Sequence, residues 1–303
     1  MTVGTLLLRQ ISIMAILVVI GYIISWKGLV TYQGSKDIGK IIQFIVLPLI
    51  VIRNFNVART PEMNHLLLES LLIAIITISV SILIARLVYP KDQVSQFSSA
   101  FCNTGGLAVP LISALFGNDQ IIYITMLLVL VIVLQWTYGI VLMTGDTKAM
   151  QPKEIIKNPI VIAMVIGILV YFIQIKFPPL MEETISHITA LNTPVGMFLC
   201  GIYLQQNDLL KVLKDKSVYT VSFVRLVLIP LVVILLFKFL PFGSYTLKMY
   251  HIIAISVAVG GNVAYIVQIY EKDYGKAVGQ YCISTILCLI TLPLIVTLAE
   301  HIL

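Results

Sequence analysis

Two short glycine-rich stretches, each inside a long apolar segment, carry polar side chains that could bind a ligand. The first contains Asn103, Thr104, Gly105, Gly106 and Pro110. Proline cannot donate a backbone hydrogen bond and glycine lowers the cost of unwinding, so we expect an interrupted helix here. The free N–H groups and partial positive charge of a restarting helix suit a carboxylate or a similar anion. A packing kink, where small residues let two helices approach closely, is the alternative interpretation.

The second stretch contains Gly260, Gly261 and Asn262, followed by Tyr265 and Gln268. A buried asparagine needs partners for both ends of its amide, which a bound anion or ion could provide. Tyr265 and Gln268 are three residues apart and therefore share a helical face. They could line a pocket or could form hydrogen bonds to a neighbouring helix. We predict a substrate site formed by Asn103, Thr104, Gly105, Gly106, Pro110, Gly260, Gly261, Asn262 and Tyr265.

Charged residues inside apolar segments are scarce, and such residues are functional candidates by default. Arg225 follows Lys216 by nine residues, so we favour snorkelling to the membrane surface or packing over substrate binding. Glu69 lies near the end of its segment, where an interfacial position is the simpler interpretation. All four histidines are expected at or near segment ends and are weak candidates for a proton relay; they are His65, His187, His251 and His301.

The sequence contains no enzyme signature. It has no His-Glu-x-x-His zinc motif, no Gly-x-Ser-x-Gly elbow and no phosphate-binding Gly-x-x-x-x-Gly-Lys-Ser/Thr loop. The cysteines have no metal-ligand spacing and are expected to be packing residues; they are Cys102, Cys200, Cys282 and Cys288. We therefore predict neither an enzyme nor a cofactor-binding protein.

Composition places these stretches in a membrane protein. The chain has 303 residues, is 59% hydrophobic and only 11% charged, whereas a soluble domain carries about 25% charged residues. The net charge of +6 therefore reflects uneven loop charge rather than a nucleic-acid partner, and the lipid bilayer is the expected partner. In a bilayer, long apolar runs can satisfy the hydrogen bonds of their backbone N–H and C=O groups within the segment only as helices. Ten spans are expected, over 5–25, 37–54, 65–88, 94–116, 119–143, 156–175, 181–204, 218–239, 247–269 and 277–299.

The basic residues are distributed unevenly between the two sides of these spans. Alternate loops hold thirteen lysine and arginine residues on one side and six on the other. The richer side is expected to face the cytoplasm. We therefore predict a multi-pass protein of the cell membrane with both termini extracytoplasmic.

The two halves of the chain resemble each other. Pro48 in the second span has a counterpart in Pro194 of the seventh, and Gly105 in the fourth has one in Gly260 of the ninth. Because each half has five spans, the second half (151–303) must enter the membrane inverted relative to the first (1–150). Inverted repeats with paired, interrupted helices are typical of secondary transporters, and the interruptions indicate the binding site.

At these residues the chain resembles the auxin efflux carrier family, which includes the plant PIN-formed auxin exporters and bacterial relatives associated with malate, malonate and similar organic anions. The stretch from Asn103 to Leu111, closing with Phe116 and Gly117, is the most specific part of the match. The rest lies along nearly the whole chain, at Gly21, Lys27-Gly28-Leu29, Pro48, Lys157-Asn158-Pro159, Gly167, Pro194, Gly201, Arg225, Pro230, Asn262, Tyr270, Asp273, Ser284-Thr285 and Leu292-Pro293-Leu294.

The resemblance implies ten helices in two inverted five-helix repeats, with the fourth and ninth helices broken and crossing. It also implies a carrier of a small organic anion that works by an elevator motion. Helices 1, 2, 6 and 7 would form the scaffold, and helices 3–5 and 8–10 would carry the site. One position departs from the family pattern, since Ala258 stands where a proline is usual. The ninth-helix break is therefore expected to depend on Gly260 and Gly261.

The bile acid:sodium symporters are similar in architecture, so a sodium-coupled organic-anion symporter is the alternative function. A membrane receptor or scaffold that has lost transport is a third. Candidate ion ligands are Thr104, Gln135 and Gln268, and the sequence assigns neither sodium nor a proton as the coupling ion. It leaves open the substrate, the direction of transport and the oligomeric state, including a homodimer.

Overall fold

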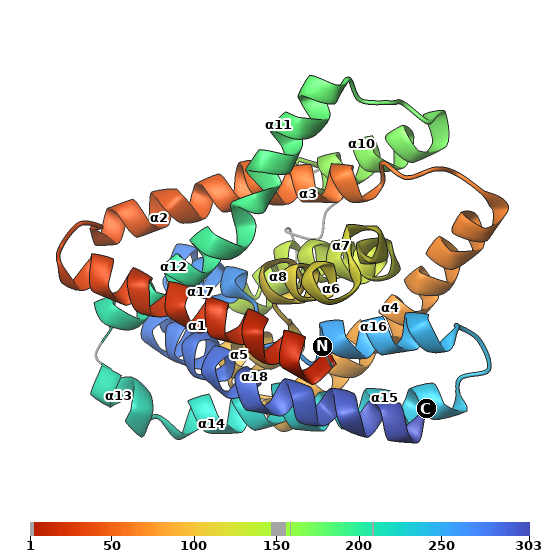
Figure 1. Cartoon of the computed structure of the whole chain (residues 1–303). Coiled ribbons are helices and arrows are strands. Elements are labelled where there is room, and N and C mark those ends of the chain that lie inside the picture. The colour runs from red at the N-terminus through yellow and green to blue at the C-terminus, as the bar shows by residue number, and fades with distance from the viewer. Residues whose placement is uncertain (1–2, 147–155, 158, 208) are drawn as a thin grey trace.

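The computed structural model describes residues 3–146, 156–157, 159–207 and 209–303. Over these residues every regular element is a helix, apart from one isolated bridge between two extended residues. Figure 1 shows the helices gathered into one bundle, in which α1 runs across the view in the direction opposite to α15 and α18. Their arrangement positions the two interrupted helices described below.

Helical elements lie at each of the ten ranges expected from hydropathy. In chain order they are α1 (Val3–Trp26), α2 (Tyr32–Ile41), η1 (Ile42–Val46), α3 (Leu47–Asn54), α4 (Pro61–Val88), α5 (Gln93–Ala100), η2 (Thr104–Ala108), α6 (Val109–Phe116), η3 (Asn118–Ile121), α7 (Ile122–Trp136), α8 (Tyr138–Thr144), α10 (Pro159–Ile173), α11 (Pro179–Ala190), α12 (Asn192–Gln206), α13 (Leu209–Lys214), α14 (Lys216–Phe223), η5 (Val224–Leu228), α15 (Ile229–Phe239), α16 (Tyr245–Ile255), α17 (Gly261–Ile269) and α18 (Tyr274–Ile302).

Length and hydropathy identify the helices that can cross a bilayer. Among the described residues, five continuous helical stretches are long and apolar enough, and three shorter apolar helices accompany them. The protein is therefore an all-helical polytopic membrane protein. The five long stretches are Pro61–Val88, Ile122–Thr144, Pro179–Gln206, Lys216–Phe239 and Tyr274–Ile302, and the shorter ones are Ser12–Trp26, Thr104–Phe116 and Pro159–Ile173.

Three prolines follow a widened π-helical turn. The turns η1, η2 and η5 each end two residues before a proline, at Pro48, Pro110 and Pro230. A proline ring clashes with the carbonyl four residues earlier and offers no N–H to it. A π turn accommodates this defect without ending the helix. In the first and last cases the helix continues, whereas η2 itself begins at a break.

Close backbone contacts hold particular helices together. α1 packs along α12, where Gly21 approaches the backbone of Phe198 and Gly201 approaches that of Val18, leaving no room for a Cβ at either glycine. α3 packs against α10, where the absence of a side chain at Gly167 leaves room for the ring of Phe55. The other closely packed pairs are α4 with α7 and α14 with α18.

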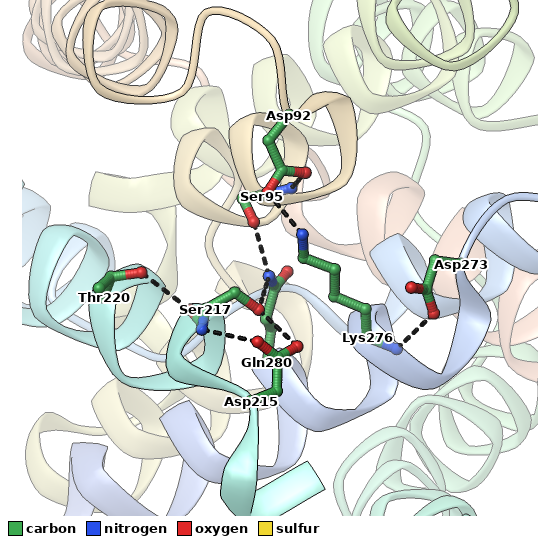
Figure 2. Close-up of polar contacts among 8 residues, drawn as sticks. All are labelled: Asp92, Ser95, Asp215, Ser217, Thr220, Asp273, Lys276 and Gln280. Carbon is green, nitrogen blue, oxygen red and sulfur yellow. Dashed lines mark hydrogen bonds and ion pairs between the residues drawn. The ribbon is translucent and has the colours of Figure 1, made fainter. Parts of the chain in front are cut away.

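A polar network joins three helix starts at one end of the bundle. Figure 2 shows Lys276 and Gln280 of α18 pointing toward the start of α5. Lys276 Nζ lies 2.5 Å from Asp92 Oδ2, and Gln280 Nε2 donates to Ser95 Oγ at 2.8 Å and to Ser217 Oγ of α14 at 3.2 Å. The network therefore ties α5, α14 and α18 into one unit.

Asp92 also caps α5, because its carboxylate accepts a hydrogen bond from Ser95 N at 3.1 Å. Partial burial acts to raise the pKa of this carboxyl group, but the hydrogen bonds from Lys276 and Ser95 outweigh burial and lower its pKa below the ordinary value. Asp92 is therefore held in its ionised form, which suits both the cap and the ion pair.

Candidate functional site

Two helices are interrupted, and their breaks lie against each other. Helix α5 ends at Ala100 before η2 begins, and α16 ends at Ile255 before α17 begins. Between the breaks, Asn103 N donates to the Ala258 carbonyl at 2.8 Å and Gly260 N donates to the Phe101 carbonyl at 2.9 Å. These bonds form a short antiparallel bridge. The second break forms although Ala258 replaces the proline usual in the family.

Arg225 supports this crossing from inside the bundle. Its side chain is 0% exposed, which excludes snorkelling. Nη1 donates to the carbonyls of Ser99 at 3.0 Å and Ala100 at 3.2 Å, and Nη2 donates to the carbonyl of Ile255. Arg225 therefore caps the C-terminal ends of α5 and α16 together, where free carbonyls carry partial negative charge.

On the other side of the breaks lies the central cavity, of about 80 Å³. No aspartate, glutamate, lysine, arginine or histidine lines it among the described residues, and amides, hydroxyls and glycines supply its polar surface. Most predicted site residues gather here, namely Asn103, Thr104, Gly105, Gly106, Gly260, Gly261, Asn262, Tyr265 and Gln135. Residues distant in sequence thus form one uncharged site, in which polar groups lie among apolar side chains.

Asn103 caps the restarting helix, since its Oδ1 accepts a hydrogen bond from Gly106 N at 3.1 Å. A Cβ on Gly106 would lie 2.6 Å from that same Oδ1, so glycine is needed for the cap to form. Thr104 is buried, and its hydroxyl lies 3.1 Å from Cys102 Sγ. The amide oxygen of Asn103 thus satisfies one helix-start N–H that a ligand could also approach.

The second break is braced by Gln135 of α7, whose Oε1 accepts a hydrogen bond from Asn262 Nδ2 at 3.2 Å. A Cβ on Gly260 would lie 2.8 Å from Gln135 Nε2 and 3.2 Å from the Cys102 carbonyl. At Gly261 the nearest atom is 3.5 Å away, on Tyr281. The close approach of the two breaks therefore depends on Gly260 much more than on Gly261.

The structure adds residues that the motifs did not indicate. Asn192, which is 5% exposed, begins α12, and its Nδ2 donates to the Gly105 carbonyl at 2.6 Å. Gln43 is buried in η1 and lines the central cavity with Tyr203 and Tyr281. One sequence feature could have indicated these residues, because a side-chain amide inside an apolar span is unusual. Gln43 and Asn192 are both such amides, and Asn192 lies two residues before Pro194.

Two predicted residues lie elsewhere. Pro110 lines a second cavity of about 520 Å³, which also contains Arg53 and which we call the Arg53 cavity. The side chain of Gln268 is outside the described part of the structure. Asn192 lines both cavities and stands between them.

Glu69 and His251 are two further ionisable residues within the expected spans, and both make hydrogen bonds inside the bundle. Glu69 is half-buried and accepts a hydrogen bond from Gly243 N at 3.2 Å. His251 was expected near a segment end, but it is 0% exposed, with Nε2 at 3.2 Å from Ser70 Oγ. Neither residue lines the central cavity. All four cysteines are free and buried, which fits their predicted packing role.

Fold and site together define a class: a polytopic helical membrane protein in which two interrupted helices meet around an uncharged cavity lined in part by polar groups. The membrane transport protein family model matches residues 7–155 and 147–296. These ranges include nearly the whole chain, so the protein belongs to this family, and the resemblance to the auxin efflux carriers is confirmed. The family consists of transporters rather than enzymes. A comparison with curated proteins gives no match.

Proposed function

We propose that the protein is a secondary carrier that moves a small organic anion across the cell membrane by an elevator-type alternation. The observation that carries this proposal is the meeting of two helix restarts, with the amides of Asn103 and Asn262, at one cavity lined by no carboxylate among the described residues. Discontinuous helices whose N-terminal ends point at a central site are typical of secondary transporters for anionic substrates.

Electrostatics favour an anion at this position. The restarting helices η2–α6 and α17 direct N–H groups and partial positive charge toward the cavity. The opposing C-terminal ends of α5 and α16 would repel an anion, but Arg225 caps both of them. These features favour an anion over a cation at the cavity, although none of the described residues that line it is charged.

The packing of the helices supports a two-repeat elevator. The first and second helices of each half pack across the halves, α1 with α12 and α3 with α10. The third and fifth helices of each half pack within their own half, α4 with α7 and α14 with α18. We propose that the first group is the scaffold and the second, with the crossing breaks, is the moving unit.

The charge asymmetry of the loops places both termini outside the cell in this proposal. Labelling of single cysteines in sealed cells checks that orientation. A cysteine at Glu300 should react with an impermeant reagent from outside, whereas one at Lys216 should not. The reverse pattern would contradict it.

The carrier proposal is tested by uptake of radiolabelled malonate or malate into proteoliposomes, with acetate and a neutral diamide as comparisons. Imposed sodium and proton gradients should be varied separately, since Thr104 and Gln135 line the cavity and could serve either coupling mode. Uptake that the Asn103→Ala variant loses would support the proposal. If no organic acid accumulates above protein-free liposomes, and none raises the unfolding temperature of the purified protein, the proposal fails.

A further inference from the structure

The Arg53 cavity is a polar hollow next to the central cavity, and it has the chemistry of a binding site. Its volume is about 520 Å³, and it lies between the end of α3, the helices α11 and α12, and α6. Asn192 is shared by both cavities. The side chain of Asn192 and its hydrogen bond to the Gly105 carbonyl at 2.6 Å therefore lie between the two cavities.

Two residues that line this cavity carry hydrogen-bond donors that are not paired with a carboxylate among the described residues. Arg53 is half-buried, and Nη1 donates to the hydroxyl of Thr189 at 2.9 Å. Among the described residues, Arg53 is in no ion pair. Asn54 follows it, and its Nδ2 is buried without a hydrogen-bond partner in the described part of the chain. Asn54 lines the cavity with other atoms of its side chain or backbone, and a buried donor ordinarily has a partner, so a small rotation of this side chain would bring its unpaired amide to the cavity wall.

One carboxylate is present at the cavity, on Glu182 in the first turn of α11. Its side chain is exposed, whereas Arg53 is half-buried. Solvent screens an exposed charge more strongly than a half-buried one. The positive charge of Arg53 therefore dominates the interior of the cavity, and Glu182 affects its mouth.

We propose that the Arg53 cavity is a second anion-binding site, in which a small organic carboxylate is held by Arg53 and Asn54 on one side of the Asn192 contact. This inference rests on the proposed function for the class of ligand. A guanidinium presents paired donors that match a carboxylate, and the amide of Asn54 would supply a third donor once its side chain turns toward the cavity. The site would concentrate the anion next to the central cavity on the side away from the lysine-rich loops.

The test uses thiol chemistry and does not require transport. Ala114 is exposed and lines the Arg53 cavity, whereas Ala58 is exposed and lies outside it. A cysteine is placed at each position in separate purified proteins. Each is labelled with the anionic sulfonatoethyl and the cationic trimethylammonium-ethyl methanethiosulfonates, and the unmodified chain is the blank. The ratio of the anionic to the cationic rate reports the local field.

Position 58 adjoins Arg59 and reports the charge of that residue, so the test is the change in the ratio that each substitution causes at position 114. Arg53→Gln should lower the ratio roughly tenfold at position 114, because a nearby charge in a partly screened site is removed, and Arg53→Lys should retain it. Arg59→Gln is the matched control, since Arg59 is an exposed arginine stacked on Phe172. An equal ratio at position 114 with and without the Arg53→Gln substitution would overturn the proposal.

Protection of the cysteine from labelling by a bound ligand distinguishes binding from electrostatic attraction of the reagent. Malonate should slow the labelling of Ala114→Cys, whereas malonamide at matched ionic strength should not, and Asn54→Leu should weaken the protection. If malonate gives no protection, the cavity is only a charged passage and the site proposal is wrong. Because labelling is measured without a gradient, a failure of proteoliposome uptake would reject the carrier proposal and leave this result intact.

Discussion

Asn103 has a structural role, and the proposed carrier also gives it a role in recognition; two substitutions can separate the two roles. Its Oδ1 caps Gly106 N, and its amide nitrogen is the donor that an anion would use. Asn103→Ala loses both, at about 1 kcal/mol of stability for the lost cap. Asn103→Asp keeps a capping oxygen but replaces the donor with a negative charge. We expect the aspartate variant to keep the unfolding temperature and lose substrate-induced stabilisation, measured by thermal unfolding with organic acids. Undiminished stabilisation in the aspartate variant would remove Asn103 from recognition.

Arg225 is predicted to hold the crossing together rather than to bind substrate. Arg225→Met leaves three buried carbonyls without their charged donor, so we expect a loss of about 3 kcal/mol or more in stability. Arg225→Lys should recover part of it. The measurement is the unfolding temperature in detergent, with Arg86→Met as the control because Arg86 is exposed. Equal unfolding temperatures for the two methionine variants would contradict this role.

At the scale of elements, the crossing depends on space at one glycine. Gly260→Ala should push the two breaks apart, because its Cβ would meet Gln135 and the Cys102 carbonyl, at a cost of about 1–3 kcal/mol. Gly261→Ala meets only ordinary contact with Tyr281 and should be tolerated. Substrate binding by the two variants, compared at equal expression, checks this. If Gly261→Ala is the more damaging of the two, the crossing is held differently.

The polar network at the start of α5 gives a pH dependence. The pKa of Asp92 is lowered in the folded protein, so its contribution to stability is present above the unfolded value of about 4 and is lost as the pH falls through the folded value. Asp92→Asn keeps the cap but removes the ion pair with Lys276. The unfolding temperature of the wild type should therefore fall more steeply than that of Asp92→Asn between about pH 5 and 3, by an amount equivalent to less than about 1 kcal/mol. Parallel curves would show that the pair contributes nothing.

The sequence was a good guide to helices and to breaks, and a poor guide to what lies between helices. Apolar runs and Gly-Pro interruptions are local signals, and they predicted the elements around Asn103 and Asn262. The partners Gln135 and Asn192 are single amides in apolar spans, and only the three-dimensional packing brings them to the breaks. Of the two roles predicted for Arg225, the structure excludes snorkelling and shows packing inside the bundle. The distance from Lys216 along the chain could not decide between them, because it says nothing about the carbonyl groups beside Arg225.

At the scale of the whole molecule, an elevator must repeatedly break the contacts between its scaffold and its moving unit. The backbones of α1 and α12 are in close contact at Gly21 and Gly201, which fits a rigid scaffold. The hydrogen bond from Asn192 to the Gly105 carbonyl is different, because it joins α12 to the broken helix. This contact also separates the central cavity from the Arg53 cavity.

If that bond restrains the motion, Asn192→Ala should increase the fraction of time that the central cavity is open. The net value of one hydrogen bond is about 1 kcal/mol, or roughly a fivefold shift between two states. Cys102 lines the central cavity and is 1% exposed, so its modification by a soluble thiol reagent reports opening in a chain whose other cysteines are alanine. Asn207→Ala is the matched control, because Asn207 Nδ2 donates to the Tyr203 carbonyl at 2.7 Å, a local contact at the end of the same helix. We expect faster labelling in the Asn192 variant and an unchanged rate in the Asn207 variant. Equal labelling rates in the two variants would mean that Asn192 stabilises the crossing of the broken helices without restraining the opening of the central cavity.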